Sequence, residues 1–210
     1  MAFFITFEGI EGCGKSTQLQ LLALRLEEGD HKVTVTREPG GCPIADQIRN
    51  ILLDAGNRAI TPLTELLLYA AARAQHVSEV VAPALATGGI VLCDRFTDAT
   101  IAYQGYARKL DLAVISQLNH LATAGVRPDL TVLLDCPADI GLKRAIARIN
   151  SAQGAREERF ELESLRFHQE VRNGYLQLAR QEPQRFVVID GTASIGDTAA
   201  AIANAVLARL

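Results

Sequence analysis

Apolar residues gather into five short runs along the chain, and between them they recur at helical spacing. The runs are FFITF (3–7), KVTVT (32–36), GIVLC (89–93), LTVLLD (130–135) and FVVID (186–190). They are near-continuous rather than alternating, which is typical of strands covered on both faces. Strands that alternate with helices predict an α/β fold, with a parallel sheet and right-handed crossovers.

Two of the stretches between the runs carry helix signals. One helix is expected from Lys15 to about residue 28, ended by Gly29, with an apolar face made of Leu19, Leu22, Ala23 and Leu26. Another begins at Thr61–Pro62, a capping threonine followed by proline at the first helical position. No repeat or linker interrupts the pattern, so we expect one domain over 1–210. The polar stretch 150–159 is either a mobile flap or an exposed loop.

Composition narrows the class of protein. The 210 residues are 49% hydrophobic and carry a net charge of −3, so any phosphate binding is expected to be local rather than that of a nucleic-acid binder. No signal peptide or run of about 18 apolar residues occurs, which favours a cytosolic protein without membrane contact. The scattered cysteines are expected to be reduced thiols: Cys13, Cys42, Cys93 and Cys136. The histidines lack ligand spacing and are expected on surfaces or helix flanks: His31, His76, His120 and His168.

The stretch FEGIEGCGKST (7–17) matches G-x-x-x-x-G-K-[ST] between a strand and a helix. Its glycines let the backbone N–H groups point at phosphate oxygens, and the helix N-terminus adds a favourable dipole. Lys15 is expected to reach the β- and γ-phosphates, and the Ser16 hydroxyl to bind Mg²⁺. The predicted ATP-binding residues are Gly9, Ile10, Glu11, Gly12, Cys13, Gly14, Lys15, Ser16 and Thr17.

The rest of the chain favours transfer of a phosphoryl group over hydrolysis. The D-x-x-G and N-K-x-D motifs of a GTPase switch are absent. No strand ends in the Asp-Glu pair with which a motor ATPase activates water, since the strand ends read Cys93-Asp94-Arg95 and Leu134-Asp135-Cys136. The ATP phosphoryl group is therefore expected to go to a bound acceptor.

Arginines follow two of the predicted strands, at the edge where open α/β sheets bind ligands. Arg37 lies in TREPGG, and Arg95 follows Asp94 in DRFTDATIAYQG. Such arginines suit a clamp for a second phosphate, and the alternative is a pair of surface salt bridges. Tyr69 and Arg73 lie four residues apart on one helix face, where they either hold a flat base or form a core tyrosine beside a surface arginine.

These parts, in this order, resemble the thymidylate (dTMP) kinase family over essentially the whole length: FEGIEGCGKST, TREPGG, YAAAR, DRFTDATIAYQG, RPDLTVLLD and EERFE. The resemblance implies a P-loop nucleoside-monophosphate-kinase fold, with a five-stranded parallel sheet flanked by helices and a short lid at about 144–161. It also implies transfer of the ATP γ-phosphoryl group to dTMP, giving ADP and dTDP. Mg²⁺ as cofactor and a cytosolic homodimer are implied as well.

The resemblance also implies roles for single residues. Arg37 and Arg95 hold the dTMP phosphate, the ring of Tyr69 stacks on thymine, and Arg73 hydrogen-bonds its carbonyl edge. The family usually has serine where this chain has Ala99, so any contact made by that hydroxyl is missing here.

Further implied contacts involve the sugar and the metal. Thr100 and Gln104 lie along the base and sugar, and Tyr103 crowds the 2′ position and so favours deoxyribose. Glu11 meets the sugar 3′-hydroxyl or the water shell of the metal. Asp94 supports Mg²⁺ through water.

Some family members carry an arginine inside the phosphate loop, where this chain has Gly12. The positive charge is then expected from the arginine-rich segment 143–172, as in bacterial-type enzymes with arginines in the lid. The predicted catalytic residues are Lys15, Arg95, Arg148, Arg156 and Arg159. Arg159 is the leading lid candidate, because it holds the arginine position of an E-R-F-E-like element. Arg166 and Arg172 are expected on a solvated helix, with glutamates as partners.

Two other functions stay open at this point. A deoxynucleoside kinase would need Glu11 as a base, and the two clamp arginines argue against it. A non-enzymatic nucleotide switch is the other alternative. The loop 190–198 either lies beside adenine or is a capped turn into a helix.

Overall fold

Five parallel strands form one sheet in the order β2-β3-β1-β4-β5, in a computed structural model that describes residues 2–151 and 159–210. The strands are β1 (Phe3–Glu8), β2 (Val33–Arg37), β3 (Ile90–Asp94), β4 (Leu130–Asp135) and β5 (Phe186–Asp190). All five predicted runs are strands, and β1 lies at the centre of the sheet. The α/β fold with a five-stranded parallel sheet is confirmed.

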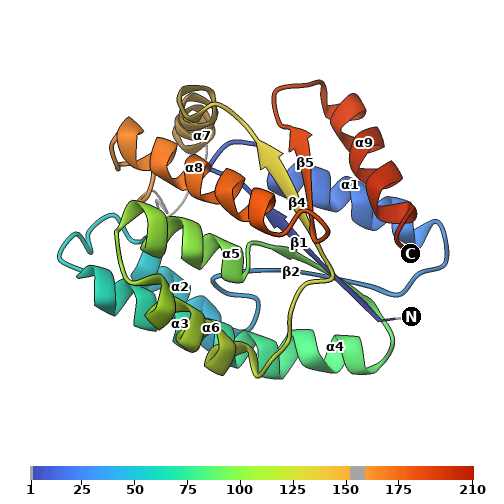
Figure 1. Ribbon diagram of the computed structural model, residues 1–210, viewed down its shortest axis with the longest axis horizontal. Helices are drawn as coiled ribbons and strands as arrows, with labels where there is room; N and C mark the ends of the chain where they lie inside the picture. Colours follow the sequence, from blue (N-terminus) through green and yellow to red (C-terminus); the bar gives the residue numbers. More distant parts are fainter. Residues whose placement is uncertain (1, 152–158) are drawn as a thin grey trace.

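Helices flank the sheet on both sides (Figure 1). Within the described residues they are α1 (Lys15–Glu27), α2 (Pro43–Leu53), α3 (Pro62–His76), α4 (Ala82–Ala86), α5 (Thr97–Thr100), α6 (Leu112–Thr123), α7 (Ala138–Ser151), α8 (Leu165–Gln181) and α9 (Ile195–Leu207), with π-helical turns η1 (Val77–Val81) and η2 (Ile101–Ala107). None of the described helices is long and apolar enough to cross a membrane.

The two predicted helices begin as expected. The predicted apolar face of α1 is buried against the sheet. The hydroxyl of Thr61 accepts a hydrogen bond from the backbone N–H of Thr64 at 3.3 Å and so caps α3. Ser194 likewise caps α9, which supports the interpretation of residues 190–198 as a capped turn.

The prediction that helices cover both faces of each strand is confirmed for the central strands and is wrong for the edge strands. Every residue of β1 is buried. Val35 of β2 is 40% exposed, and Val188 of β5 is 48% exposed. Each edge strand has only one neighbouring strand, and the helical layers cover it incompletely.

The expected surface position is confirmed for His31 and His120 and is wrong for the other two histidines. His76 is 0% and His168 is 1% exposed, and each lies beside a buried glutamate, Glu38 or Glu11. A buried imidazole needs hydrogen-bond partners, and sequence spacing does not reveal partners so distant along the chain. The four cysteines are free and buried.

The carboxyl ends of three strands meet at one edge of the sheet. Phe7 of β1 and Arg37 of β2 both align with Asp94 of β3. The segments that follow these strands are therefore neighbours, although about 30 to 60 residues separate them along the chain.

Candidate active site

A cleft of about 530 Å³ opens at this edge of the sheet. Most of the predicted site residues line it: Glu11, Gly12, Gly14, Lys15, Ser16, Thr17, Arg37, Tyr69, Arg73, Asp94, Arg95, Thr100, Tyr103, Gln104 and Arg148. Gly9, Ile10 and Cys13 belong to the same loop but are not part of the lining, and Ile10 and Cys13 are buried behind it. One cavity thus joins the predicted ATP loop to the predicted acceptor side.

The phosphate loop takes its shape from three glycines with positive φ angles. The φ values are 136° at Gly9, 69° at Gly12 and 98° at Gly14, a region that side chains with a Cβ rarely adopt. The ammonium of Lys15 donates to the carbonyl of Ile10 at 2.8 Å and to that of Gly9 at 3.1 Å. The backbone carbonyls of the loop therefore hold the Lys15 side chain folded back over the loop, beside the cleft.

Gly12 packs directly against the start of α7. A Cβ at this position would lie 2.0 Å from the carbonyl oxygen of Gly141. In the reverse direction, a Cβ at Gly141 would lie 2.5 Å from the carbonyl oxygen of Glu11. This packing leaves no room for an arginine at position 12, so any arginine in the cleft has to come from other segments.

Two of the residues, Ser16 and Asp94, could hold Mg²⁺. The Ser16 hydroxyl donates to Asp94 Oδ2 at 2.7 Å, which brings a hydroxyl and a carboxylate together at the mouth of the phosphate loop. No group of three or more metal-binding side chains occurs in residues 2–151 and 159–210. Mg²⁺ bound with ATP takes most of its ligands from phosphate and water, so this small set fits the ion.

Arg95 links the acceptor side to the phosphate loop. Its Nη1 donates to the carbonyl of Gly9 at 3.0 Å and to the hydroxyl of Tyr175 at 3.1 Å, while Nη2 donates to Glu11 Oε1 at 2.9 Å. The guanidinium also lies over the ring of Tyr103, 4.9 Å from its centroid. Among the described contacts, Nε–H and one Nη2–H of Arg95 stay available to a ligand in the cleft.

Glu11 stays ionised although it is largely buried. Burial would raise the pKa of Glu11, but the charge of Arg95, a hydrogen bond from His168 and the charge of Lys15 hold this pKa well below its usual range. The Tyr103 hydroxyl also donates to Glu11 Oε1. The carboxylate is therefore a fixed negative charge, and it is a poor base for deprotonating a sugar hydroxyl.

Arg37 lies at the rim of the cleft and is more exposed than Arg95. Its Nη2 pairs with Asp46 of α2 at 3.2 Å, and its side chain is 56% exposed. An exposed pair of this kind contributes little to stability. Arg37 is therefore free to exchange Asp46 for a stronger anion such as a phosphate.

Arg73 is not a surface arginine, so that alternative is excluded. Its side chain is 2% exposed, pairs with Glu38 at 2.7 Å, and donates to Asn119 at 2.7 Å and to the Phe96 carbonyl at 3.0 Å. Tyr69, one turn earlier on α3, is half-buried with its ring 6.4 Å from that of Phe160. Both side chains line the cleft, and the hydrogen bonds to its buried partners fix the orientation of Arg73.

Thr100 and Gln104 lie on the wall formed by α5 and η2. The Gln104 amide donates to Glu65 at 2.7 Å, which fixes its orientation. The Thr100 hydroxyl is buried and has no hydrogen-bond partner among the described residues. A buried unpaired hydroxyl at a cleft wall is available to a ligand.

The lid arginines differ in their positions. Arg148, on α7, lines the cleft. Arg159 does not: it pairs with Glu65 at 2.7 Å, donates to the carbonyl of Leu52 and is buried. Arg156 lies outside the described residues. Arg172 binds Asp135 of β4 through two hydrogen bonds, at 2.6 and 2.8 Å, so the expected pairing with helix glutamates is wrong.

Sequence reasoning missed the buried acids that hold the clamp. Glu8, Glu38 and Glu65 are each almost fully buried, and each bonds to a group of the cleft wall: Phe96, Arg73 and Gln104 respectively. The available signal was an ionisable residue at the end of an apolar strand, or one turn before a helical tyrosine. Such a signal marks a buried acid without naming its partner.

The fold and the cleft together define a P-loop kinase of the nucleoside-monophosphate-kinase type. Residues 7–202 match the model of the family "Thymidylate kinase". The chain belongs to the thymidylate kinase family.

Named relatives cover the whole chain. It is 70% identical to the thymidylate kinase of Geotalea uraniireducens over 210 residues, covering 100% of this chain and 99% of the relative. It is 65% identical to the thymidylate kinase of Geobacter sulfurreducens, with the same coverage. A crystal structure of thymidylate kinase from Ehrlichia chaffeensis superposes with a TM-score of 0.77 at 35% identity, covering 98% of each chain. The predicted family and fold are confirmed.

Proposed function

We propose that this protein transfers the γ-phosphoryl group of ATP to dTMP, giving ADP and dTDP, a step toward dTTP for DNA synthesis. The observation that carries the proposal is the position of Arg95. It lies in the same cleft as the phosphate loop and has donors free for a second phosphate. Membership of the thymidylate kinase family supports dTMP as the acceptor and ATP as the donor.

The donor's phosphates lie along residues 9–17. Backbone N–H groups of the loop and the N-terminus of α1 bind the phosphate oxygens, and Lys15 adds a positive charge. Lys15 then exchanges its carbonyl partners, Gly9 and Ile10, for phosphate oxygens. Ser16 and Asp94 would hold Mg²⁺, Asp94 through water, and the ion would supply positive charge that neutralises the phosphates.

The acceptor lies on the arginine side of the cleft. Arg95 and Arg37 hold the phosphate of dTMP, and the ring of Tyr69 stacks on thymine. Arg73 donates to the carbonyl edge of the base, since its two Nη groups have hydrogens beyond those that bind protein.

The sugar lies between α5, η2 and the phosphate loop. Thr100 and Gln104 lie along the base and sugar, and Tyr103 crowds the 2′ position. Glu11 accepts from the 3′-hydroxyl. The low pKa of Glu11 keeps it an acceptor across the physiological pH range.

The reaction needs positioning and positive charge rather than a base. The acceptor atom is a phosphate oxygen that is ionised near neutral pH, so no side chain has to remove a proton. Arg95 and Lys15 both supply positive charge beside the phosphate loop, and Arg148 adds charge from α7. Arg159 takes part only after it leaves Glu65, and Arg156 remains a candidate from sequence. The segment 144–161 acts as a lid of a single domain spanning 1–210.

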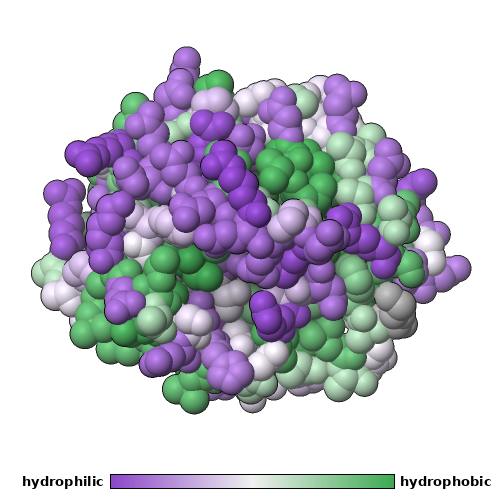
Figure 2. All heavy atoms as spheres, viewed as in Figure 1, coloured by the Kyte–Doolittle hydropathy of each residue, from purple (hydrophilic) through white to green (hydrophobic). Residues whose placement is uncertain are grey.

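We further propose that the protein is a cytoplasmic homodimer. Exposed apolar side chains on the neighbouring helices α2, α3 and α6 support this: Ile44, Ile51, Leu63, Leu67, Leu112, Val114 and Leu121. Figure 2 shows hydrophobic side chains gathered at the lower left, over α3 and α6. Light scattering on the purified protein gives the mass directly, and a monomer at micromolar concentration would contradict this part.

The test of the reaction is a coupled ADP-release assay with ATP and Mg²⁺. Acceptors are dTMP, dUMP, dCMP, dGMP, AMP and thymidine. We expect strong turnover with dTMP, weaker turnover with dUMP and almost none with thymidine. Turnover with thymidine but not with dTMP would contradict the phosphate clamp of Arg37 and Arg95, and would make Glu11 a base.

A further inference from the structure

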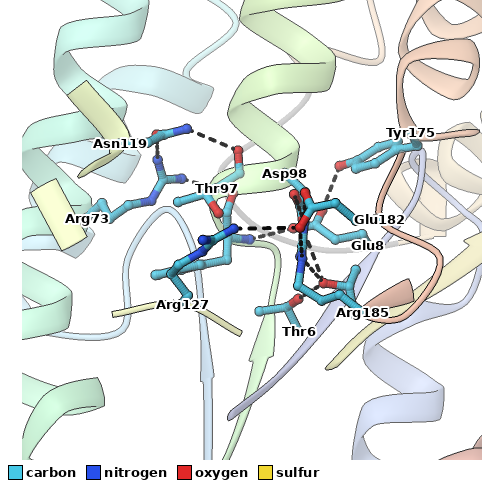
Figure 3. A network of polar contacts seen from close by, with 12 residues as sticks. Thr6, Glu8, Arg73, Thr97, Asp98, Asn119, Arg127, Tyr175, Glu182 and Arg185 are labelled. Carbon is cyan, nitrogen blue, oxygen red and sulfur yellow. Dashed lines mark hydrogen bonds and ion pairs between the residues drawn. The ribbon is translucent and has the colours of Figure 1, made fainter. Parts of the chain in front are cut away.

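The short segment that carries Arg95 is held in place by buried polar groups from several elements. Arg95 itself has a φ of 69°, in the left-handed region that a residue with a Cβ rarely adopts. Figure 3 shows part of the surrounding network, to which Glu8 of β1, Arg73 of α3 and Tyr175 of α8 belong. A strained backbone of this kind persists only where its surroundings determine it.

Glu8 is the member of this network that touches the segment most directly. It ends β1 and is completely buried. Its Oε1 accepts a hydrogen bond from the backbone N–H of Phe96 at 2.7 Å, next to the strained residue. Its Oε2 accepts from the hydroxyl of Tyr175, also at 2.7 Å. One carboxyl group thus binds both the backbone beside Arg95 and a side chain from α8.

Tyr175 continues the chain of hydrogen bonds to the guanidinium. Arg95 Nη1 donates to the Tyr175 hydroxyl oxygen at 3.1 Å. An arginine has no acceptor, so the tyrosine oxygen receives this bond and its own hydrogen points to Glu8. Glu8 therefore fixes the direction of the hydroxyl, and the hydroxyl fixes one edge of the guanidinium.

We propose that Glu8 is a positioning residue, which acts through Phe96 and Tyr175 to hold the Arg95 guanidinium in the orientation that binds the acceptor's phosphate. The proposal rests on the role proposed above for Arg95. Glu8 itself is buried and is not among the residues that line the cleft.

Burying the Glu8 carboxyl group has a cost to stability. Burial raises the pKa of Glu8 to about 8; the negative charge of Asp98 adds to this shift, while Arg95 and the Tyr175 hydrogen bond oppose it. Arg185 binds Asp98 through hydrogen bonds of 2.7 and 2.9 Å and balances part of that charge. A neutral apolar residue at this position would avoid the cost of burying a carboxyl group, and it would lose both hydrogen bonds.

Two variants test the proposal. Glu8→Gln keeps the shape and the acceptor for Phe96, but at pH 9, above the pKa of Glu8, its amide donates to Tyr175 where the carboxylate accepts. Tyr175→Phe removes only the link between Glu8 and Arg95. We expect each variant to weaken dTMP binding about tenfold, measured by titration calorimetry on the full chain, because a hydrogen bond to a charged group is lost. Thymidine, which lacks the phosphate held by Arg95, should bind within about twofold of the unaltered protein.

The double variant and a matched control sharpen the result. Because Glu8 and Tyr175 act in one chain, the double variant should lose hardly more dTMP affinity than either single variant. Tyr106→Phe is the control, since the described part of the chain shows no hydrogen bond from this hydroxyl. It should change neither dTMP nor thymidine binding.

Each outcome has a distinct meaning. Equal losses for dTMP and thymidine would overturn the proposal and make Glu8 a structural residue only. Unchanged dTMP binding in Tyr175→Phe would overturn it as well, and this variant still decides if Glu8→Gln does not fold. Failure of the unaltered protein to bind dTMP would count against the proposed function itself, a result separate from either of these.

Discussion

The two sides of the cleft are built in different ways. The donor side is a single loop, in which backbone carbonyls, backbone N–H groups and Lys15 lie within a few residues of one another. The acceptor side is assembled from side chains of distant elements. Arg95 follows β3 and meets Glu11 of the phosphate loop and Tyr175 of α8, 80 residues away along the chain.

The difference concerns how each side keeps its shape. Glycines with positive φ angles shape the donor loop locally, and α1 continues from it. On the acceptor side, buried glutamates hold arginines that would otherwise be flexible, as Glu38 holds Arg73. Removing one partner of such a pair leaves a buried charge without compensation, which is strongly destabilising.

The largest expected effect is on the acceptor side, in Arg95→Ala. We expect kcat/KM for dTMP to fall about a thousandfold, because the variant loses both the phosphate clamp and a charge beside the transferring group. Initial rates of ADP release measure it. Arg25→Ala is the control, an exposed arginine of α1 that pairs with Glu28, and it should stay within about twofold. A loss below about tenfold for Arg95→Ala would mean that the acceptor side contributes no more to kcat/KM than the donor side does.

Alanine variants of Arg159 and Arg148 distinguish an effect on stability from an effect on turnover within the lid. Arg159→Ala breaks a buried pair with Glu65 and should lower the free energy of unfolding by about 3 kcal/mol. Arg148→Ala should leave stability within about 1 kcal/mol and lower kcat instead, because Arg148 lines the cleft.

Denaturant unfolding and turnover are measured on both lid variants. If turnover per folded molecule falls less than about tenfold in Arg159→Ala, the catalytic role moves to Arg148 or Arg156.

On the donor side, Gly12→Ala tests how tightly the loop is packed. A Cβ there would meet the backbone of Gly141 and force a strained φ, so we expect a loss of about 3 kcal/mol in the free energy of unfolding. Gly125→Ala is the matched control: its φ is 84°, and no atom lies within 4 Å of the added Cβ. It should cost about 1 kcal/mol from the backbone conformation alone. Equal losses in the two variants would show that the contact between the phosphate loop and α7 has no effect on stability.

A further prediction concerns stability alone: the pH dependence of unfolding changes in Glu8→Gln. The pKa of Glu8 is about 8 in the folded protein, against 4.5 for an ordinary glutamate. Below about pH 4.5 the group is protonated in both states. Between pH 4.5 and 8 only the unfolded chain has released the proton, so stability falls as pH rises through this window and levels off above it. Thermal unfolding between pH 5 and 8 should therefore show a flatter decline in the variant, and an identical slope would contradict the raised pKa.

Local sequence was enough to predict the donor side and most of the fold. The apolar runs predicted all five strands, because a buried parallel strand needs continuous apolar residues. Gly9, Gly14, Lys15 and Ser16 predicted the phosphate loop, because their roles depend on backbone conformation over a few residues. The edge strands were misjudged, since their apolar runs look like those of the centre and only the strand order distinguishes them.

The acceptor side was predicted as a set of residues and not as an arrangement. The sequence placed Arg37 and Arg95 at one edge of the sheet and Tyr69 and Arg73 on one helix face, and the structure brings all four to one cleft. It could not show that Arg73 is buried or that Arg159 pairs with Glu65. Such pairs form between residues with no fixed spacing along the chain, so no local sequence pattern predicts them.

By itself, the sequence determined the fold class, the family and the glycine-rich loop between β1 and α1, because each follows from residues that act within short segments. Only the tertiary structure decided which charges are buried, which arginines reach the cleft, and that Glu8 lies behind Arg95. Those properties depend on the partners that folding brings together from distant parts of the chain, and on the loss of water around them.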